Sequence, residues 1–334
     1  MRIRAYIGFM LALGTSLLGG LHANAGETPK EPIDTVTPKG PRISFVTARG
    51  EEIARDSSSS VIPFSRAGNL ILVQASVDSI QGNFILDTGA PHLVLNITYF
   101  RDYPQHAVEG EQTSMTGSSA SIVRTTVKEV TFGAINYYNM EADLANLGHI
   151  ENTRGVKILG LLGVELFKQC EMIIDYEKNL IYVHYIARKE EKTYQHEMLK
   201  DTEGYRSFPI DITDNRIMVA TEMAGKKLKF VIDCAAESNV IDSRLPDKIF
   251  DNVEITRRVV LKGVNNRNVD ALYGDLKNMK INNQDIGTLP VLITNLANTC
   301  FSYAGCVDGI LGFDFLSLHK IGFNFVKRKM YIWK

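Results

Sequence analysis

The 334-residue sequence predicts an all-β protein built from two similar lobes. From position 43 onward the chain is a series of short apolar or alternating runs, such as LILVQASV and EMIIDY, broken by Gly, Asn, Asp and Ser. Runs of this length with turn residues between them are typical of β-strands. Helical stretches are expected only at about 161–168, 313–318 and 242–250. The prediction of two lobes comes from an internal duplication.

The duplication is visible as one phrase that occurs twice and ends each time at an aspartate. FILD ending at Asp87 aligns without a gap with FVID ending at Asp233, and the apolar runs before them align at the same offset. Farther along, residues 162–182 align with residues 311–331, again without a gap. Each repeat therefore supplies one carboxylate, and paired carboxylates perform general acid and base catalysis without a metal.

Changes in composition divide the chain into five segments. Residues 1–25 contain two arginines, an apolar stretch and the small-residue tripeptide ANA, which is the pattern of a Sec-type signal peptide. Residues 26–42 form a Pro- and Thr-rich flexible leader, 43–186 a first lobe, 187–206 a charged interlobe linker and 207–334 a second lobe.

The signal peptide predicts export to a periplasmic or extracellular location. An uncleaved anchor is disfavoured because the apolar stretch is short, contains glycine and ends in a cleavage-type tripeptide. No later segment of the sequence is long and apolar enough to cross a bilayer, so no stable span is expected after cleavage.

Composition and charge narrow the class of function. The chain is 45% hydrophobic and 22% charged, its formal net charge is -1, and no run of Lys or Arg tracks a phosphate backbone, so nucleic-acid binding is not expected. Its seven histidines lack metal-ligand spacing, and no phosphate-binding glycine loop occurs, so neither a metal nor a cofactor is expected. Both acids lie on one chain, which favours a monomer.

The four cysteines divide into two pairs. Cys300 and Cys306 are close in sequence and have no counterparts in the first repeat, and an exported chain permits disulfides, so a bridge between them is predicted. Cys170 and Cys234 are expected to be buried thiols that act as small apolar side chains.

The segment FILDTGA predicts a buried strand followed by a turn that holds a carboxylate. Its three apolar residues predict a buried strand that ends at Asp87, followed by a tight turn. Gly89 lets the backbone approach the carboxylate, so that amide N–H groups can hold it, and Thr88 offers a hydroxyl to a neighbouring lobe. Asp-Thr-Gly alone is weak evidence of function, and its context makes it informative.

That context resembles the retropepsin-like and pepsin-like aspartic peptidases. The resemblance rests on VIPF, a hairpin, FILDTGA and a later LLG followed by EMIIDYEKNLIYV; it covers about residues 60–185 and, more weakly, 207–334. It implies two tandem acid-protease β-barrel lobes in a bilobal architecture, and an endopeptidase whose catalytic pair is Asp87 and Asp233, with peptide or protein substrates. The supporting residues that it implies are Thr88, Gly89, Ala90, Cys234, Ala235, Leu162, Gly163, Leu311 and Gly312.

The second repeat departs from this pattern. Cys234 replaces the threonine with a weaker hydrogen-bonding thiol, and Ala235 replaces the glycine with a residue that carries a Cβ. These changes question both the interlobe hydroxyl lock and the turn that orients Asp233. The alternative is therefore a catalytically impaired protein that binds extended peptides in the interlobe cleft. Pairing of two chains through their first lobes is a third possibility, which the duplication disfavours.

Two further expectations concern the surroundings of the acids. The family places a β-hairpin flap between its two motifs, and the turn-forming candidates here are Thr116, Gly117, Ser118, Gly263 and Val264. Ala90 and Ala236 follow the two triplets and offer no hydroxyl to the carboxylates, which predicts raised pKa values and activity in weakly acidic to near-neutral conditions.

Overall fold

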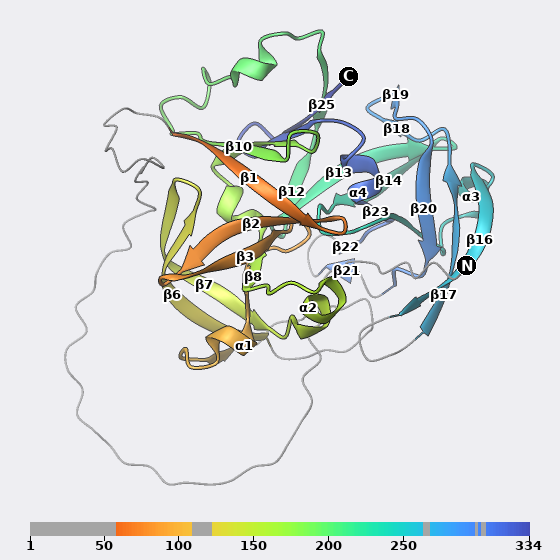
Figure 1. The fold of residues 1–334 in the computed structure, drawn as a ribbon. Helices are drawn as coiled ribbons and strands as arrows, with labels where there is room; N and C mark the ends of the chain where they lie inside the picture. The colour runs from red at the N-terminus through yellow and green to blue at the C-terminus, as the bar shows by residue number, and fades with distance from the viewer. Residues whose placement is uncertain (1–57, 109–121, 263–267, 298–299, 302–304) are drawn as a thin grey trace, which may run out of the picture.

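The computed structural model describes residues 58–108, 122–262, 268–297, 300–301 and 305–334. Within them the fold is all-β, which confirms the predicted class (Figure 1). The signal peptide and the leader lie outside the described residues, as do the flap candidates Thr116, Gly117, Ser118, Gly263 and Val264. The strands of the first half are β1 (Ser59–Ala67), β2 (Leu70–Val77), β3 (Ile80–Leu86), β4 (Leu93–Asn96), β5 (His106–Val108), β6 (Ile122–Phe132), β7 (Ile135–Ala145), β8 (Gly160–Leu162), β9 (Cys170–Asp175) and β10 (Leu180–Tyr185).

The second half repeats this strand order, with additions. Its strands are β11 (Tyr205–Pro209), β12 (Asp211–Thr213), β13 (Arg216–Met223), β14 (Lys226–Ile232), β15 (Asn239–Asp242), β16 (Val253–Lys262), β17 (Asn268–Leu276), β18 (Lys280–Ile281), β19 (Gln284–Asp285), β20 (Leu289–Thr294), β21 (Cys300–Phe301), β22 (Gly305–Cys306), β23 (Gly309–Leu311), β24 (Ile321–Asn324) and β25 (Lys329–Trp333).

The two halves share one strand topology around their aspartates. In the first half, β8 lies between β3 and β4, parallel to β3 and antiparallel to β4, and β4 is parallel to β7. In the second half, β23 lies between β14 and β15 with the same orientations, and β15 is parallel to β20. The strand that leads into each aspartate is therefore central to its sheet.

A sheet formed by both halves joins them. Its order is β11-β25-β24-β9-β10-β1, and its link is the antiparallel pair of β9 with β24, in which Ile174 faces Ile321. The chain ends in β25, which lies near β10 at the top of Figure 1. An ion pair between Arg154 and Glu237 also connects the halves.

Helices are few and short among the described residues. They are α1 (Ile97–Phe100), α2 (Gly148–Arg154), α3 (Asp247–Phe250), α4 (Phe313–Leu316) and the 3-10 helices η1 (Val164–Phe167) and η2 (Glu197–Leu199). The helix expected at 161–168 begins only at Val164, because Leu161 and Leu162 are buried in β8. Similarly, Asp242 belongs to β15, so the helix expected at 242–250 is confined to α3.

Apolar side chains from both halves form the largest core cluster. The alternating runs of β2 and β13 turn residues such as Val73 and Val219 inward, and Phe84 and Phe230 occupy equivalent places in β3 and β14. Burial of these side chains supplies the main driving force for packing the sheets. No helix in the described part of the chain has the length and apolar character needed to cross a membrane.

Candidate active site

The loop after β3 holds Asp87 in place. The Asp87 amide donates to Leu162 O at 3.0 Å, which ties the loop to β8. The carboxylate oxygen Oδ1 accepts hydrogen bonds from the backbone amides of Gly89 at 2.8 Å and Ala90 at 3.0 Å. Amide donors of this kind orient a carboxylate and stabilise its ionised form.

The loop after β14 repeats these contacts around Asp233. The Asp233 amide donates to Leu311 O at 3.0 Å, and Oδ1 accepts from the amides of Ala235 at 2.8 Å and Ala236 at 3.1 Å. Ala235 is not among the described residues that have a positive φ. The turn therefore forms without strain, and the doubt that the alanine raised about the orientation of Asp233 is not supported.

Asp87 and Asp233 come together where the two loops meet. Their carboxyl groups lie close enough for each to influence the pKa of the other, and the two residues are 3% and 1% exposed. Gly89 makes this approach possible, since a Cβ at that position would lie 2.5 Å from Asp233 Oδ2. The glycine is required here by space, because its φ lies outside the left-handed region.

Burial changes the titration of both acids. It raises the pKa of Asp87 well above its usual range, the negative charge of Asp233 raises it further, and the Gly89 and Ala90 amides oppose the shift. Burial also raises the pKa of Asp233, against the opposing effect of its own amide donors. Two carboxyl groups in such contact hold one proton between them over a wide pH range.

Reciprocal hydrogen bonds lock the two loops together. Thr88 Oγ1 donates to Ile232 O at 3.0 Å and accepts from the Cys234 amide at 2.9 Å. In the other direction, Cys234 Sγ donates to Leu86 O at 3.1 Å and accepts from the Thr88 amide at 3.4 Å.

Cys234 therefore takes the place of a hydroxyl residue in this lock. The expectation that it acts only as a small apolar side chain is wrong, although it is buried and free as expected. Burial raises the pKa of its thiol, so the S–H donor is retained. Cys170 is also a free, buried thiol, and burial raises its pKa to about 12.

The glycines of the second motif pack behind the two loops. A Cβ on Gly163 would lie 2.7 Å from Ala90 O, and a Cβ on Gly312 would lie 2.6 Å from Ala236 O. Contacts this close leave no space for a side chain. Leu162 and Leu311 contribute the carbonyls that receive the aspartate amides.

Comparison with known proteins identifies the family. The family model described as "Aspartyl protease" matches the chain twice, over residues 73–166 and 219–315, once for each repeat. The chain belongs to the aspartyl protease family. The two matched segments each contain one of the paired aspartates, so the tandem duplication read from the sequence is confirmed.

Two solved structures match this chain at low sequence identity. The aspartic proteinase from Irpex lacteus is 12% identical, with a TM-score of 0.47; the alignment covers 83% of this chain and 97% of that one. Basic 7S globulin from soybean is 10% identical, with a TM-score of 0.43 and coverage of 83% and 95%. No curated protein matches the sequence.

A charged residue without a counterpart in the first half lies beside the pair of this aspartyl protease. Arg216 begins β13 after a turn in which Asp214 and Asn215 have positive φ. Since Ile217 pairs with Ile232, Arg216 falls beside Asp233 in the ladder. Burial raises the pKa of Asp233, the amides of Ala235 and Ala236 oppose the rise, and the charge of Arg216 adds to their effect. Burial lowers the pKa of Arg216, and the charges of Asp214, Asp87 and Asp233 oppose this shift.

The equivalent position in the first half is Leu70, which pairs toward Asp87 in the β2–β3 ladder and is 3% exposed. Sequence reasoning did not find Arg216 as a site residue. The signal was present, because Leu70 and Arg216 align at the same offset as the two aspartates.

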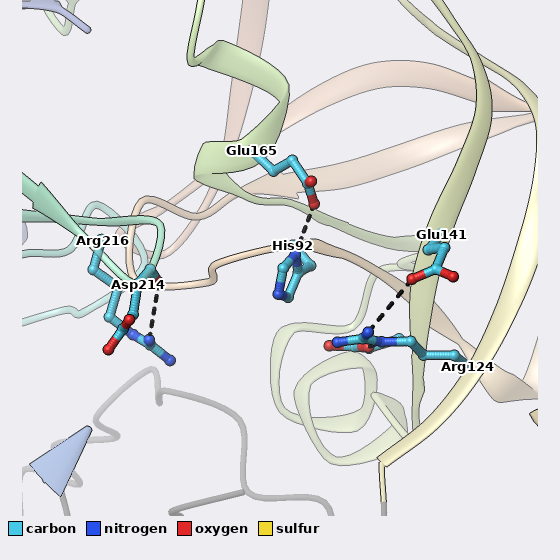
Figure 2. A network of polar contacts seen from close by, with 7 residues as sticks. His92, Arg124, Glu141, Glu165, Asp214 and Arg216 are labelled. Atoms are coloured by element: carbon cyan, nitrogen blue, oxygen red, sulfur yellow. Dashed lines mark hydrogen bonds and ion pairs between the residues drawn. The ribbon is translucent and has the colours of Figure 1, made fainter. Parts of the chain in front are cut away.

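His92 and Glu165 were also not predicted as a pair. In the structure His92 Nδ1 lies 2.7 Å from Glu165 Oε2 (Figure 2). Cys306 is disulfide-bonded, and Cys300 is its register partner in the β21–β22 ladder, which is the backbone pairing that the predicted bridge needs. The described residues contain no group of side chains arranged to hold a metal.

Proposed function

We propose that this protein is an exported aspartic endopeptidase that hydrolyses peptide bonds with water activated by Asp87 and Asp233. The observation that carries the proposal is the close approach of two buried carboxyl groups, each held by two amides in equivalent loops. Family membership supports peptidase activity in general. The proposal of export rests on residues 1–25 of the sequence.

In the proposed reaction the two acids have different roles. In this proposal Asp233 is the ionised member, because its amide donors, and after them the charge of Arg216, oppose the rise of its pKa. Asp233 removes a proton from a water molecule. Asp87 is the protonated member and donates its proton to the carbonyl oxygen of the scissile peptide bond. The water oxygen adds to the carbonyl carbon and forms a tetrahedral diol.

The second half of the reaction returns the protons. The proton held by Asp233 passes to the amide nitrogen, the C–N bond breaks, and a diol hydroxyl returns a proton to Asp87 as the new carboxyl group forms. No covalent intermediate with the protein is required. The starting protonation state is restored for the next cycle.

The alternative of a peptide-binding protein without turnover was based on Cys234 and Ala235. Both residues take part in the same backbone contacts that Thr88 and Gly89 make in the first half, so the observation that favoured the alternative no longer does so.

The proposal is tested by exposing an unbiased peptide library to the purified chain without residues 1–25. We expect cleavage by the parent and by Asp251→Asn, a variant of an exposed aspartate that matches the chemistry of the change. Asp87→Asn is expected to cleave nothing. If the parent cleaves no peptide while the Asp87→Asn variant still binds library peptides, the result favours the alternative of a peptide-binding protein without turnover.

A further inference from the structure

A cavity of about 330 Å³ lies against the loop that follows Asp87 and is lined by charged side chains. His92 belongs to that loop, and Glu165 belongs to η1, directly after β8. Arg124 of β6 and both Glu141 and Asp143 of β7 complete its charged lining. Figure 2 shows Arg124 and Glu141 on one side of His92 and Arg216 on the other.

Carboxylates are in excess in this cavity. Arg124 Nε donates to Asp143 Oδ1 at 2.6 Å, and its Nη1 lies 3.4 Å from Glu141 Oε2. The hydrogen bond from His92 lowers the pKa of Glu165, so this carboxylate is ionised at neutral pH. Three carboxylates therefore face one guanidinium, and the cavity is negative whether His92 is neutral or protonated.

These acids retain the capacity to bind a cation. Each of these contacts engages one oxygen of its carboxylate: Oδ1 of Asp143, Oε2 of Glu141 and Oε2 of Glu165. A carboxylate has acceptor capacity on both oxygens, so a second donor can be accommodated at each. Met140 also lines the cavity and offers an apolar surface to the methylene stem of a long side chain.

The cavity is attached directly to the loop of Asp87. The Val164 amide donates to Ala90 O at 3.0 Å, and the Glu165 amide donates to Pro91 O at 3.2 Å. The chain from Asp87 to His92 spans at most about 17 Å when fully extended. An extended peptide covers that distance in about five residues, so a side chain near the scissile bond can reach the cavity.

We infer that this cavity is a specificity subsite that accepts a basic side chain, Lys or Arg, of the substrate. The inference rests on the proposed endopeptidase function. Arg124 orients Asp143 and Glu141 around the ligand ammonium or guanidinium group, and His92 orients Glu165 in the same way. Acidic substrate side chains are disfavoured by the excess of negative charge.

The test places Lys, its uncharged isostere norleucine, or Glu at each position within five residues of a cleaved bond. At one position we expect Lys to be preferred to norleucine by about tenfold in kcat/KM, and Glu to be the poorest. In the double variant Glu141→Gln/Glu165→Gln the Lys preference should fall to about threefold or less. Glu254→Gln, a change of an exposed glutamate on β16, should retain it.

Binding of the same peptides to the Asp87→Asn chain, with and without the two glutamate changes, is also measured by fluorescence anisotropy. Selective binding of the Lys peptide that is lost in the chain carrying Glu141→Gln and Glu165→Gln supports the subsite. This holds even if the parent cleaves nothing, and in that case only the endopeptidase proposal fails. Cleavage or binding without a Lys preference overturns the subsite, as does a preference that survives in the double variant.

Discussion

Arg216 lies beside Asp233 where β13 begins and β14 ends, and its charge interacts with both Asp233 and Asp87. Leu70 fills the equivalent position beside Asp87. A positive charge next to one carboxylate stabilises its ionised form, whereas an apolar side chain does not. The duplication has therefore diverged at the position beside the two aspartates.

Arg216→Met is predicted to move the acidic limb of the pH–rate profile to higher pH. Loss of the positive charge raises the pKa of Asp233, so a higher pH is needed to ionise it, and we expect a shift of about half a pH unit or more. The measurement is kcat/KM between pH 3 and pH 8 on a cleaved peptide. Arg216→Lys keeps the charge and serves as the control, and an acidic limb that does not move in the Met variant would exclude this role.

Asp87→Asn is predicted to stabilise the protein at neutral pH. The pKa of Asp87 is raised in the folded state, so the native protein binds this proton more tightly than the unfolded chain does. Stability is then lost as pH rises from the ordinary aspartate value of about 3.9 through the folded pKa, at about 1.4 kcal/mol for each pKa unit of the shift.

Asparagine does not titrate, so the advantage of the variant should grow between pH 4 and pH 7. Urea unfolding at both pH values measures the difference, and Asp251→Asn gives the baseline for an exposed aspartate. An advantage of the same size at both pH values would show that Asp87 is not the origin of the effect.

Gly89→Ala and Ala235→Gly are predicted to affect activity differently, although each introduces the residue found at the equivalent position of the other half. A methyl group at position 89 would press on the Asp233 carboxylate, so Gly89→Ala should reduce kcat by at least about a hundredfold. Ala235 has an ordinary φ and packs in a small apolar cluster with Leu70 and Leu72, so Ala235→Gly should cost about 1 kcal/mol of stability and retain activity. Equal losses of activity would contradict the spatial reason given for the glycine.

Cys234→Val is predicted to lower the free energy of unfolding by about 1–3 kcal/mol, because the Leu86 carbonyl loses its donor in a buried site. Cys234→Thr restores a hydroxyl donor of similar size and should be as stable as the parent or more so. Thermal unfolding of the two variants provides the comparison. If the Val and Thr variants are equally stable, the hydrogen bond from the sulfur does not contribute to the stability of the paired loops.

Much of this fold is predictable because its signals are local. Runs such as LILVQASV coincide with β2 from Leu70 to Val77, and the repeat identifies Asp87 and Asp233 before any contact is known. The helix expected at 161–168 was partly wrong because a short apolar run fits a buried strand as well as a helix, and burial on both sides of β8 decides for the strand.

The features that the sequence does not predict lack a local signal or depend on contacts between distant segments. Helix α1 is a single short turn that Asn96 caps through the Thr98 amide, and it has no apolar periodicity to reveal it. The contact of His92 with Glu165 joins residues far apart in sequence. The thiol of Cys234 has a hydrogen-bonding role only because the other loop brings Leu86 O to it.

The most direct test of the central claim is the rate of peptide hydrolysis by Asp87→Asn and Asp233→Asn, measured on one cleaved peptide beside the parent and Asp251→Asn. Each active-site change removes a group that transfers a proton, so we predict a loss of at least about a hundredfold in kcat for both, with the exposed control unchanged and all folds intact by circular dichroism. Hydrolysis by either variant within about tenfold of the parent would contradict the assignment of Asp87 and Asp233 as the catalytic pair.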